Sequence, residues 1–191
     1  PTPFTKGSIS GDVIDTEGNP IESAKLKLKG KNTKTRFKTT SNESGYFEFD
    51  NLEADTYKIK IQKRGYRNVK QEVILAEGEG KEVDKIMGYD VSGKWRGYMD
   101  SNLIPKTFIT LTLNQSGNKV SGSLRGGGGQ TGTVNGTIDE DILEFKLKTT
   151  TQGCPGSFKG TATIIDVDNM DFTFQGSDCA GKHIGDGYVS R

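Results

Sequence analysis

Histidine is almost missing from this sequence, with one residue in 191. A single imidazole excludes metal sites built from several histidines and most catalytic schemes that rely on histidine as a base. Tryptophan occurs once, cysteine twice and proline five times. No stretch approaches the roughly 18 consecutive apolar residues of a membrane-spanning helix, so the sequence predicts no transmembrane segment.

An excess of charge of one sign is also missing. The 26 Lys and Arg residues stand against 25 Asp and Glu, a formal net charge of +1. A nucleic-acid binder shows a basic excess, so we expect no nucleic-acid partner. The chain opens with Pro-Thr-Pro-Phe and no initiator Met. We therefore expect a processed or trimmed chain, compatible with a lipid anchor on a missing N-terminus.

The composition changes near residue 88. The residues before this point contain 9 of the 26 glycines and neither cysteine, whereas the rest contain 17 glycines, both cysteines and the tryptophan. We expect two domains, 1–88 and 89–191, each large enough for a small core.

Residues 1–88 alternate between apolar and charged positions. Ala24-x-Leu26-x-Leu28 and Tyr57-x-Ile59-x-Ile61 are interleaved with lysines, and turn residues recur about every 8–12 positions. This period of two predicts a β-sandwich.

Residues 7–87 resemble the carboxypeptidase regulatory-like domain. The resemblance rests on Gly11-Asp12-Val13-Ile14-Asp15, Gly18-Asn19-Pro20-Ile21, Gly45-Tyr46-Phe47-Glu48-Phe49, Tyr57 and Gly65-Tyr66. It implies a seven-stranded, transthyretin-like β-sandwich. It also implies a non-catalytic accessory module of the kind common in bacterial surface and secreted proteins.

Residues 89–191 contain eight short alternating segments separated by turn signals. They are 91–98, 108–113, 120–124, 133–138, 142–148, 158–165, 170–175 and 183–190. An even number of strands with short connections favours an eight-stranded up-and-down antiparallel β-barrel, and a sandwich is the alternative. The whole chain is therefore predicted to be all-β.

Gly93-Lys94-Trp95 is similar to the Gly-x-Trp on the first strand of calycin barrels, the lipocalin-like and avidin-like folds. The resemblance covers 89–191 and implies that Trp95 plugs the closed end of the barrel. A basic residue of the last strand covers this Trp in those barrels, and Arg191 has that place here. The ligands of those families are not carried over.

Three glycines occupy positions predicted to face the barrel interior: Gly122, Gly136 and Gly160. Glycine weakens a buried strand unless something needs the space. The glycines either let the sheet coil tightly or make room for a bulky neighbour such as Trp95, or they leave space for a ligand cavity. In the second case these glycines would line it together with Phe145, Phe158, Phe172 and Phe174. A ligand would enter where the predicted loops 99–107, 125–132, 149–157 and 176–182 gather.

Cys154 and Cys179 flank a predicted hairpin centred near Val167. Both cysteines lie on the predicted loops at the end where a ligand would enter. Two cysteines in an all-β chain of secreted appearance favour a disulfide. The alternative is a metal site of both cysteines and His183, which lacks a fourth ligand. We expect no metal and no cofactor.

No nucleophile–base or acid–base pair can be placed in the sequence, so we expect no enzyme. The sequence favours a secreted, periplasmic or cell-surface bacterial protein that acts as a binding or interaction module. Its partner would be a small apolar ligand in the barrel or another envelope protein. The alternative is a purely structural or assembly module of an envelope complex, with a filled barrel.

Overall fold

The computed structural model describes residues 5–191 and divides into two compact units, Pro1–Gly88 and Tyr89–Arg191. The opening Pro-Thr-Pro-Phe, which prompted the expectation of a processed chain, lies outside the described residues. Within the described part, no helix has the length and apolar character that a membrane span requires. The chain is all-β, as predicted, and its described helical residues form the short 3-10 turn η1, Gly127–Gly129.

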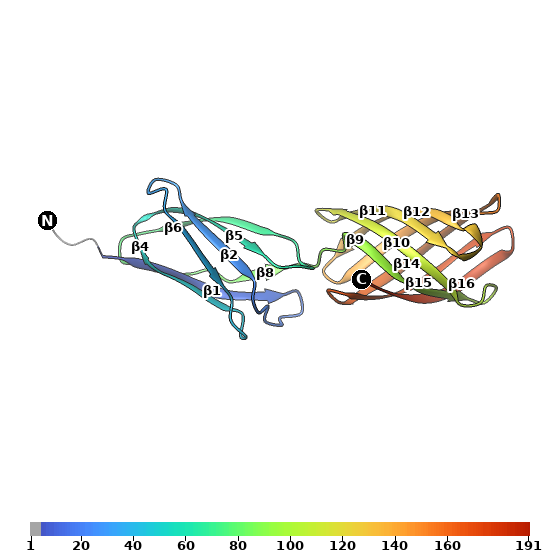
Figure 1. Ribbon diagram of the computed structural model, residues 1–191, viewed down its shortest axis with the longest axis horizontal. Helices are drawn as coiled ribbons and strands as arrows, with labels where there is room; N and C mark the ends of the chain where they lie inside the picture. Colours follow the sequence, from blue (N-terminus) through green and yellow to red (C-terminus); the bar gives the residue numbers. More distant parts are fainter. Residues whose placement is uncertain (1–4) are drawn as a thin grey trace. The chain divides into compact units, whose positions relative to one another are not determined.

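The first unit is a sandwich of two four-stranded sheets (Figure 1). One sheet has the order β4-β1-β7, with β8 also pairing with β1, and the other has the order β3-β2-β5-β6. The strands are β1 Gly7–Asp15, β2 Lys25–Gly30, β3 Arg36–Thr40, β4 Tyr46–Leu52, β5 Asp55–Gln62, β6 Val69–Leu75, β7 Gly80–Glu82 and β8 Lys85–Met87.

The period of two decides which side chains reach the core between the sheets. In β2, Leu26 and Leu28 are each 1% exposed, while the lysines that alternate with them face solvent. In β5, which pairs with β2, Ile59 and Ile61 are fully buried on the same face of the sheet as the two leucines.

The seventh strand expected for this sandwich is present as two short pieces, β7 and β8, which both run parallel to β1. The break lies at Val83, whose amide donates to the carbonyl of Ser10 at 2.8 Å. The neighbouring Gly11 accommodates it, since a Cβ there would lie 2.5 Å from the Val83 carbonyl oxygen.

Asp55, the first residue of β5, holds the turn between β2 and β3. Its carboxylate accepts hydrogen bonds from the backbone N–H of Thr33 at 2.9 Å and from that of Asn32 at 3.0 Å. The Thr33 hydroxyl donates a further bond at 2.9 Å. Burial raises the pKa of Asp55, but these bonds outweigh it and lower the pKa from 3.8 to about 2.

The second unit is a closed barrel in which every neighbouring pair of strands is antiparallel (Figure 1). Its strands are β9 Gly93–Ser101, β10 Thr107–Ser116, β11 Lys119–Gly126, β12 Thr131–Asp139, β13 Ile142–Thr151, β14 Cys154–Asp166, β15 Asn169–Asp178 and β16 Gly181–Ser190. Pairing of β9 with β16 closes the ring. All eight predicted strands are present, and the up-and-down barrel is confirmed.

Connections 102–106, 127–130, 152–153 and 179–180 lie at one end of the barrel, called the mouth below. Connections 117–118, 140–141 and 167–168 lie at the other, the turn end. The predicted mouth loops at 149–157 and 176–182 are mostly strand, so two of the four mouth connections are as tight as those of the turn end. The reason is register: pairs such as Thr149–Gly156 extend the β13–β14 ladder beyond the apolar alternation.

Candidate functional site

The turn end of the barrel is shut by Trp95 and Arg191. The Trp95 ring is fully buried, and its indole N–H donates to the Val91 carbonyl at 2.9 Å. The Arg191 guanidinium carbon lies 4.3 Å from the ring centroid, within cation–π range. The same guanidinium donates to the carbonyls of Ser92 and Asp90. Trp95 and Arg191 therefore pack against each other at the turn end of the barrel.

Four phenylalanines point into the barrel, and each is paired with a glycine on the next strand. The pairs are Phe145–Gly160, Phe158–Gly176, Phe172–Gly187 and Phe174–Gly185. In each pair a Cβ on the glycine would lie between 2.2 and 2.6 Å from a ring carbon of its phenylalanine. The absence of a side chain at each glycine thus leaves room for an aromatic ring, and any larger residue would displace the ring that it faces.

The three glycines singled out from the sequence do not line the interior cavity. A Cβ on Gly122 would lie 2.2 Å from the carbonyl oxygen of Thr112 on the next strand. The corresponding distance is 2.3 Å from Gly136 to the Glu144 oxygen. At Gly160 the Phe145 ring takes the space as well. The close approach of a neighbouring strand therefore leaves little room for a side chain at any of these three glycines.

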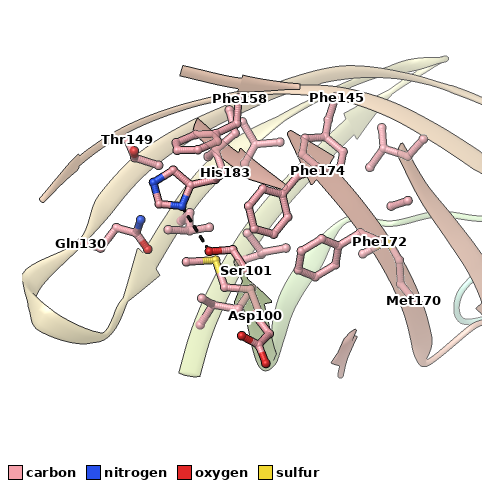
Figure 2. A pocket seen from close by; sticks show the side chains of 18 of the residues that line it. Asp100, Ser101, Gln130, Phe145, Thr149, Phe158, Met170, Phe172, Phe174 and His183 are labelled. Atoms are coloured by element: carbon pink, nitrogen blue, oxygen red, sulfur yellow. Dashed lines mark hydrogen bonds between the residues drawn. The ribbon is translucent and has the colours of Figure 1, made fainter. Parts of the chain in front are cut away.

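The four phenylalanines do line a cavity inside the barrel (Figure 2). Their rings form a continuous series, with edge contacts from Phe145 to Phe172 at 6.4 Å and from Phe158 to Phe174 at 6.0 Å. Phe172 and Phe174 join the two pairs at 6.2 Å. The cavity measures about 60 Å³. That volume holds a few atoms rather than a large ligand, because occupied pockets typically measure about 300–1,000 Å³.

Polar side chains gather where the cavity approaches the mouth. The Ser101 hydroxyl oxygen accepts the backbone N–H of Ile104 at 3.1 Å and lies 3.2 Å from His183 Nδ1. The Asp178 carboxylate that faces Nε2 only accepts hydrogen bonds, so in the neutral ring Nε2 donates to it and the Ser101 hydroxyl hydrogen is directed at Nδ1. That assignment makes Nδ1 an acceptor and leaves the proton on Nε2 when His183 is neutral.

His183, 2% exposed, is satisfied on its second nitrogen by Asp178. Its Nε2 donates to the Asp178 carboxylate at 2.9 Å. Burial raises the pKa of Asp178, but hydrogen bonds from His183 and from the Ala180 amide outweigh it and hold that pKa below its usual value. Both ring nitrogens are engaged, so His183 serves to fasten β16 to the ends of β9 and β15.

Gln130 completes the polar end of the cavity, and sequence reasoning missed it. It lies after a run of four glycines, is 8% exposed, and lines the cavity with its side chain. Its Oε1 is buried without a hydrogen-bond partner among the described residues. An unmet acceptor of this kind costs about 1–3 kcal/mol. A glutamine beside a glycine-rich turn gives no pattern from which burial could be read.

The predicted disulfide between Cys154 and Cys179 is confirmed, with Cα atoms 5.8 Å apart. Cys154 opens β14 and Cys179 follows β15, so the bridge ties these two strands together at the mouth. Among residues 5–191, no group of three or more His, Cys, Asp or Glu side chains is arranged to hold a metal ion. His183 turns to Asp178 instead of the cysteines.

Comparisons with solved structures give distant similarities. The major pilin subunit of Bacillus cereus matches 98% of this chain at 11% identity with a TM-score of 0.49, and the match covers 59% of the pilin. A candidate carbohydrate-binding protein of Bacteroides uniformis matches 97% of this chain at 11% identity with a TM-score of 0.37, over 99% of its own length. Hydroxyquinol 1,2-dioxygenase of Pseudomonas putida matches 47% of this chain at 11% identity with a TM-score of 0.40, and the match covers 58% of the enzyme.

The matches thus span less than two thirds of the pilin and of the dioxygenase. At TM-scores below 0.5, none of the three similarities assigns a function. No curated protein matches the sequence. The model of one family does match, over residues 8–87, and these residues form most of the two-sheet sandwich. That family is the carboxypeptidase regulatory-like domain, whose model describes the first unit of this chain.

Proposed function

We propose that this protein is a non-catalytic binding module of the bacterial cell surface or envelope. In this proposal the barrel of the second unit holds a small apolar ligand, and the carboxypeptidase regulatory-like domain acts as a spacer. The observation that carries the proposal is the aromatic cavity, which is shut at the turn end and bears an unmet hydrogen-bond acceptor at the mouth.

The chemistry of the cavity supports an apolar ligand. Its walls are formed mainly by aromatic and aliphatic side chains such as Phe145, Phe172 and Met170, and the polar side chains of Gln130, Thr149 and His183 gather at one end (Figure 2). Ligand pockets have this composition, in which a few polar groups orient a mostly apolar molecule. Entry through the mouth follows because Trp95 and Arg191 close the opposite end.

The surroundings of the cavity support a non-catalytic role, and they support a location outside the cytoplasm. The single histidine has both nitrogens occupied, by Ser101 and Asp178. A disulfide such as Cys154–Cys179 persists in oxidising compartments, including the bacterial periplasm and cell surface.

A second candidate function is assembly within an envelope complex, with the barrel as a filled structural core. The size of the cavity favours it, since about 60 Å³ lies well below the volume of an occupied pocket. Under this hypothesis the glycine–phenylalanine pairs serve packing alone.

Native mass spectrometry of freshly purified protein separates the two functions. A carried ligand adds mass to the intact chain, and we expect that mass to disappear in Ala162→Leu, which fills the cavity from β14. Ala162→Val is a milder filling variant that guards against misfolding. Thr161→Leu is the matched control, because the neighbouring Thr161 faces outward on the same strand. Protein of bare mass in every variant, with no uptake of added apolar compounds, would favour the assembly function.

A further inference from the structure

The side chain of Gln130 is buried at the mouth, and its Oε1 has no hydrogen-bond partner among the described residues. The turn before it is fixed by the Gly126 amide, which donates to the Gln130 carbonyl at 2.9 Å. The Oε1 atom lies close to this turn, 2.5 Å from where a Cβ on Gly126 would be. A larger residue at position 126 would have to push the Gln130 amide group aside.

Two other polar side chains at this end of the cavity, Ser101 and His183, already have hydrogen-bond partners. His183 is engaged by Ser101 and by Asp178. Figure 2 shows His183, Thr149 and Gln130 on one side of the cavity, with Met170 and Phe172 on the other. Among the described side chains that line it, Gln130 supplies a buried oxygen that has no partner.

We propose that Gln130 recognises the polar head of the ligand, which is a neutral hydrogen-bond donor on an unbranched aliphatic chain. This inference rests on the proposed function of the barrel. A carbonyl oxygen only accepts hydrogen bonds, so the ligand must donate, through a hydroxyl or an amide N–H. A charged ammonium is disfavoured, because the nearby Asp178 carboxylate is already committed to His183.

The volume of the cavity selects the shape of the ligand body. An apolar cavity of about 150 Å³ takes up benzene, and the present one measures about 60 Å³. A ring would have to displace the phenylalanines, whereas a short unbranched chain adds only a few atoms and enters from the mouth with its carbons among Phe145, Phe172 and Met170. The donor head then remains beside Gln130.

Two isomeric probes small enough for the cavity test this inference: propan-1-ol, which donates a hydrogen bond, and methoxyethane, which only accepts. Binding is followed by the methyl resonances of the three methionines. Met99 and Met170 line the cavity, while Met87 lies in the core of the first unit and serves as an internal control. We expect the wild-type protein to bind the alcohol about tenfold more tightly than the ether, a difference equivalent to about 1.4 kcal/mol.

Gln130→Leu should remove this preference, so that the alcohol and the ether bind with equal affinity. Thr131→Val is the matched control on the neighbouring, exposed position and should retain it. Trp95 fluorescence confirms that each variant is folded.

The outcomes separate this inference from the proposed function. Equal affinities in the wild type, or a preference that survives Gln130→Leu, overturn the role of Gln130 while leaving a ligand-binding barrel. If neither probe shifts Met99 or Met170, the proposed function fails and the inference fails with it.

Discussion

Truncation of Arg191 should destabilise the second unit alone. Arg191→Ala removes a guanidinium that lies 4.3 Å from the centroid of the buried Trp95 ring and donates to the carbonyls of Ser92 and Asp90. The cation–π contact contributes roughly 0.5–2 kcal/mol. Hydrogen bonds from a charged donor contribute about 1.5–3 kcal/mol each where they are desolvated. Arg191 is half-buried and water can reach the freed carbonyls, so we expect a total loss of about 2–3 kcal/mol.

The assay follows from the composition of the chain. Trp95 is the only tryptophan, so its fluorescence during denaturant titration reports unfolding of the second unit and not of the first. For a unit of this size, the expected loss corresponds to a fall in Tm of roughly 10 °C or more. Arg191→Lys should be intermediate, because an ammonium retains the charge but cannot both stack on the ring and reach two carbonyls.

Arg96→Ala is the control for loss of an arginine. Its side chain is exposed on β9, and its removal should change stability by about 0.5 kcal/mol at most. The reasoning is refuted if Arg191→Ala and Arg96→Ala unfold at the same denaturant concentration as the wild type.

Three further changes have expected outcomes. Gly160→Ala places a Cβ 2.1 Å from the Thr173 carbonyl oxygen and should cost about 1–3 kcal/mol in the same fluorescence titration, a loss that an unchanged midpoint would contradict. Replacement of Cys154 and Cys179 by serine opens a loop of separation 25 and should cost about 3.5 kcal/mol; intact wild-type protein should weigh about 2 Da less than its reduced form. Asp55 has a lowered pKa, so its stabilisation is complete above about pH 4 and is lost as the pH falls towards about 2. Calorimetric melts of the first unit should show this loss in the wild type and a flatter profile in Asp55→Asn.

Local patterns in the sequence were sufficient for the architecture. A period of two tells which side chains face the core without any knowledge of neighbouring strands, as Leu26 and Leu28 illustrate. The order of eight strands joined by short connections restricts each strand to its sequence neighbours, so the barrel follows. The disulfide was predictable for the same reason, since Cys154 and Cys179 flank a single hairpin.

Only the tertiary structure decided what the interior contains. The role of Gly160 depends on how closely the Thr173 carbonyl approaches it, which follows from strand register and coiling. Ser101 and His183 meet across 82 positions of sequence because β16 closes the barrel on β9. The cavity is the small volume left over after many side chains have packed. No single segment of the chain encodes that remainder, so neither its size nor the buried oxygen of Gln130 could be read from the sequence.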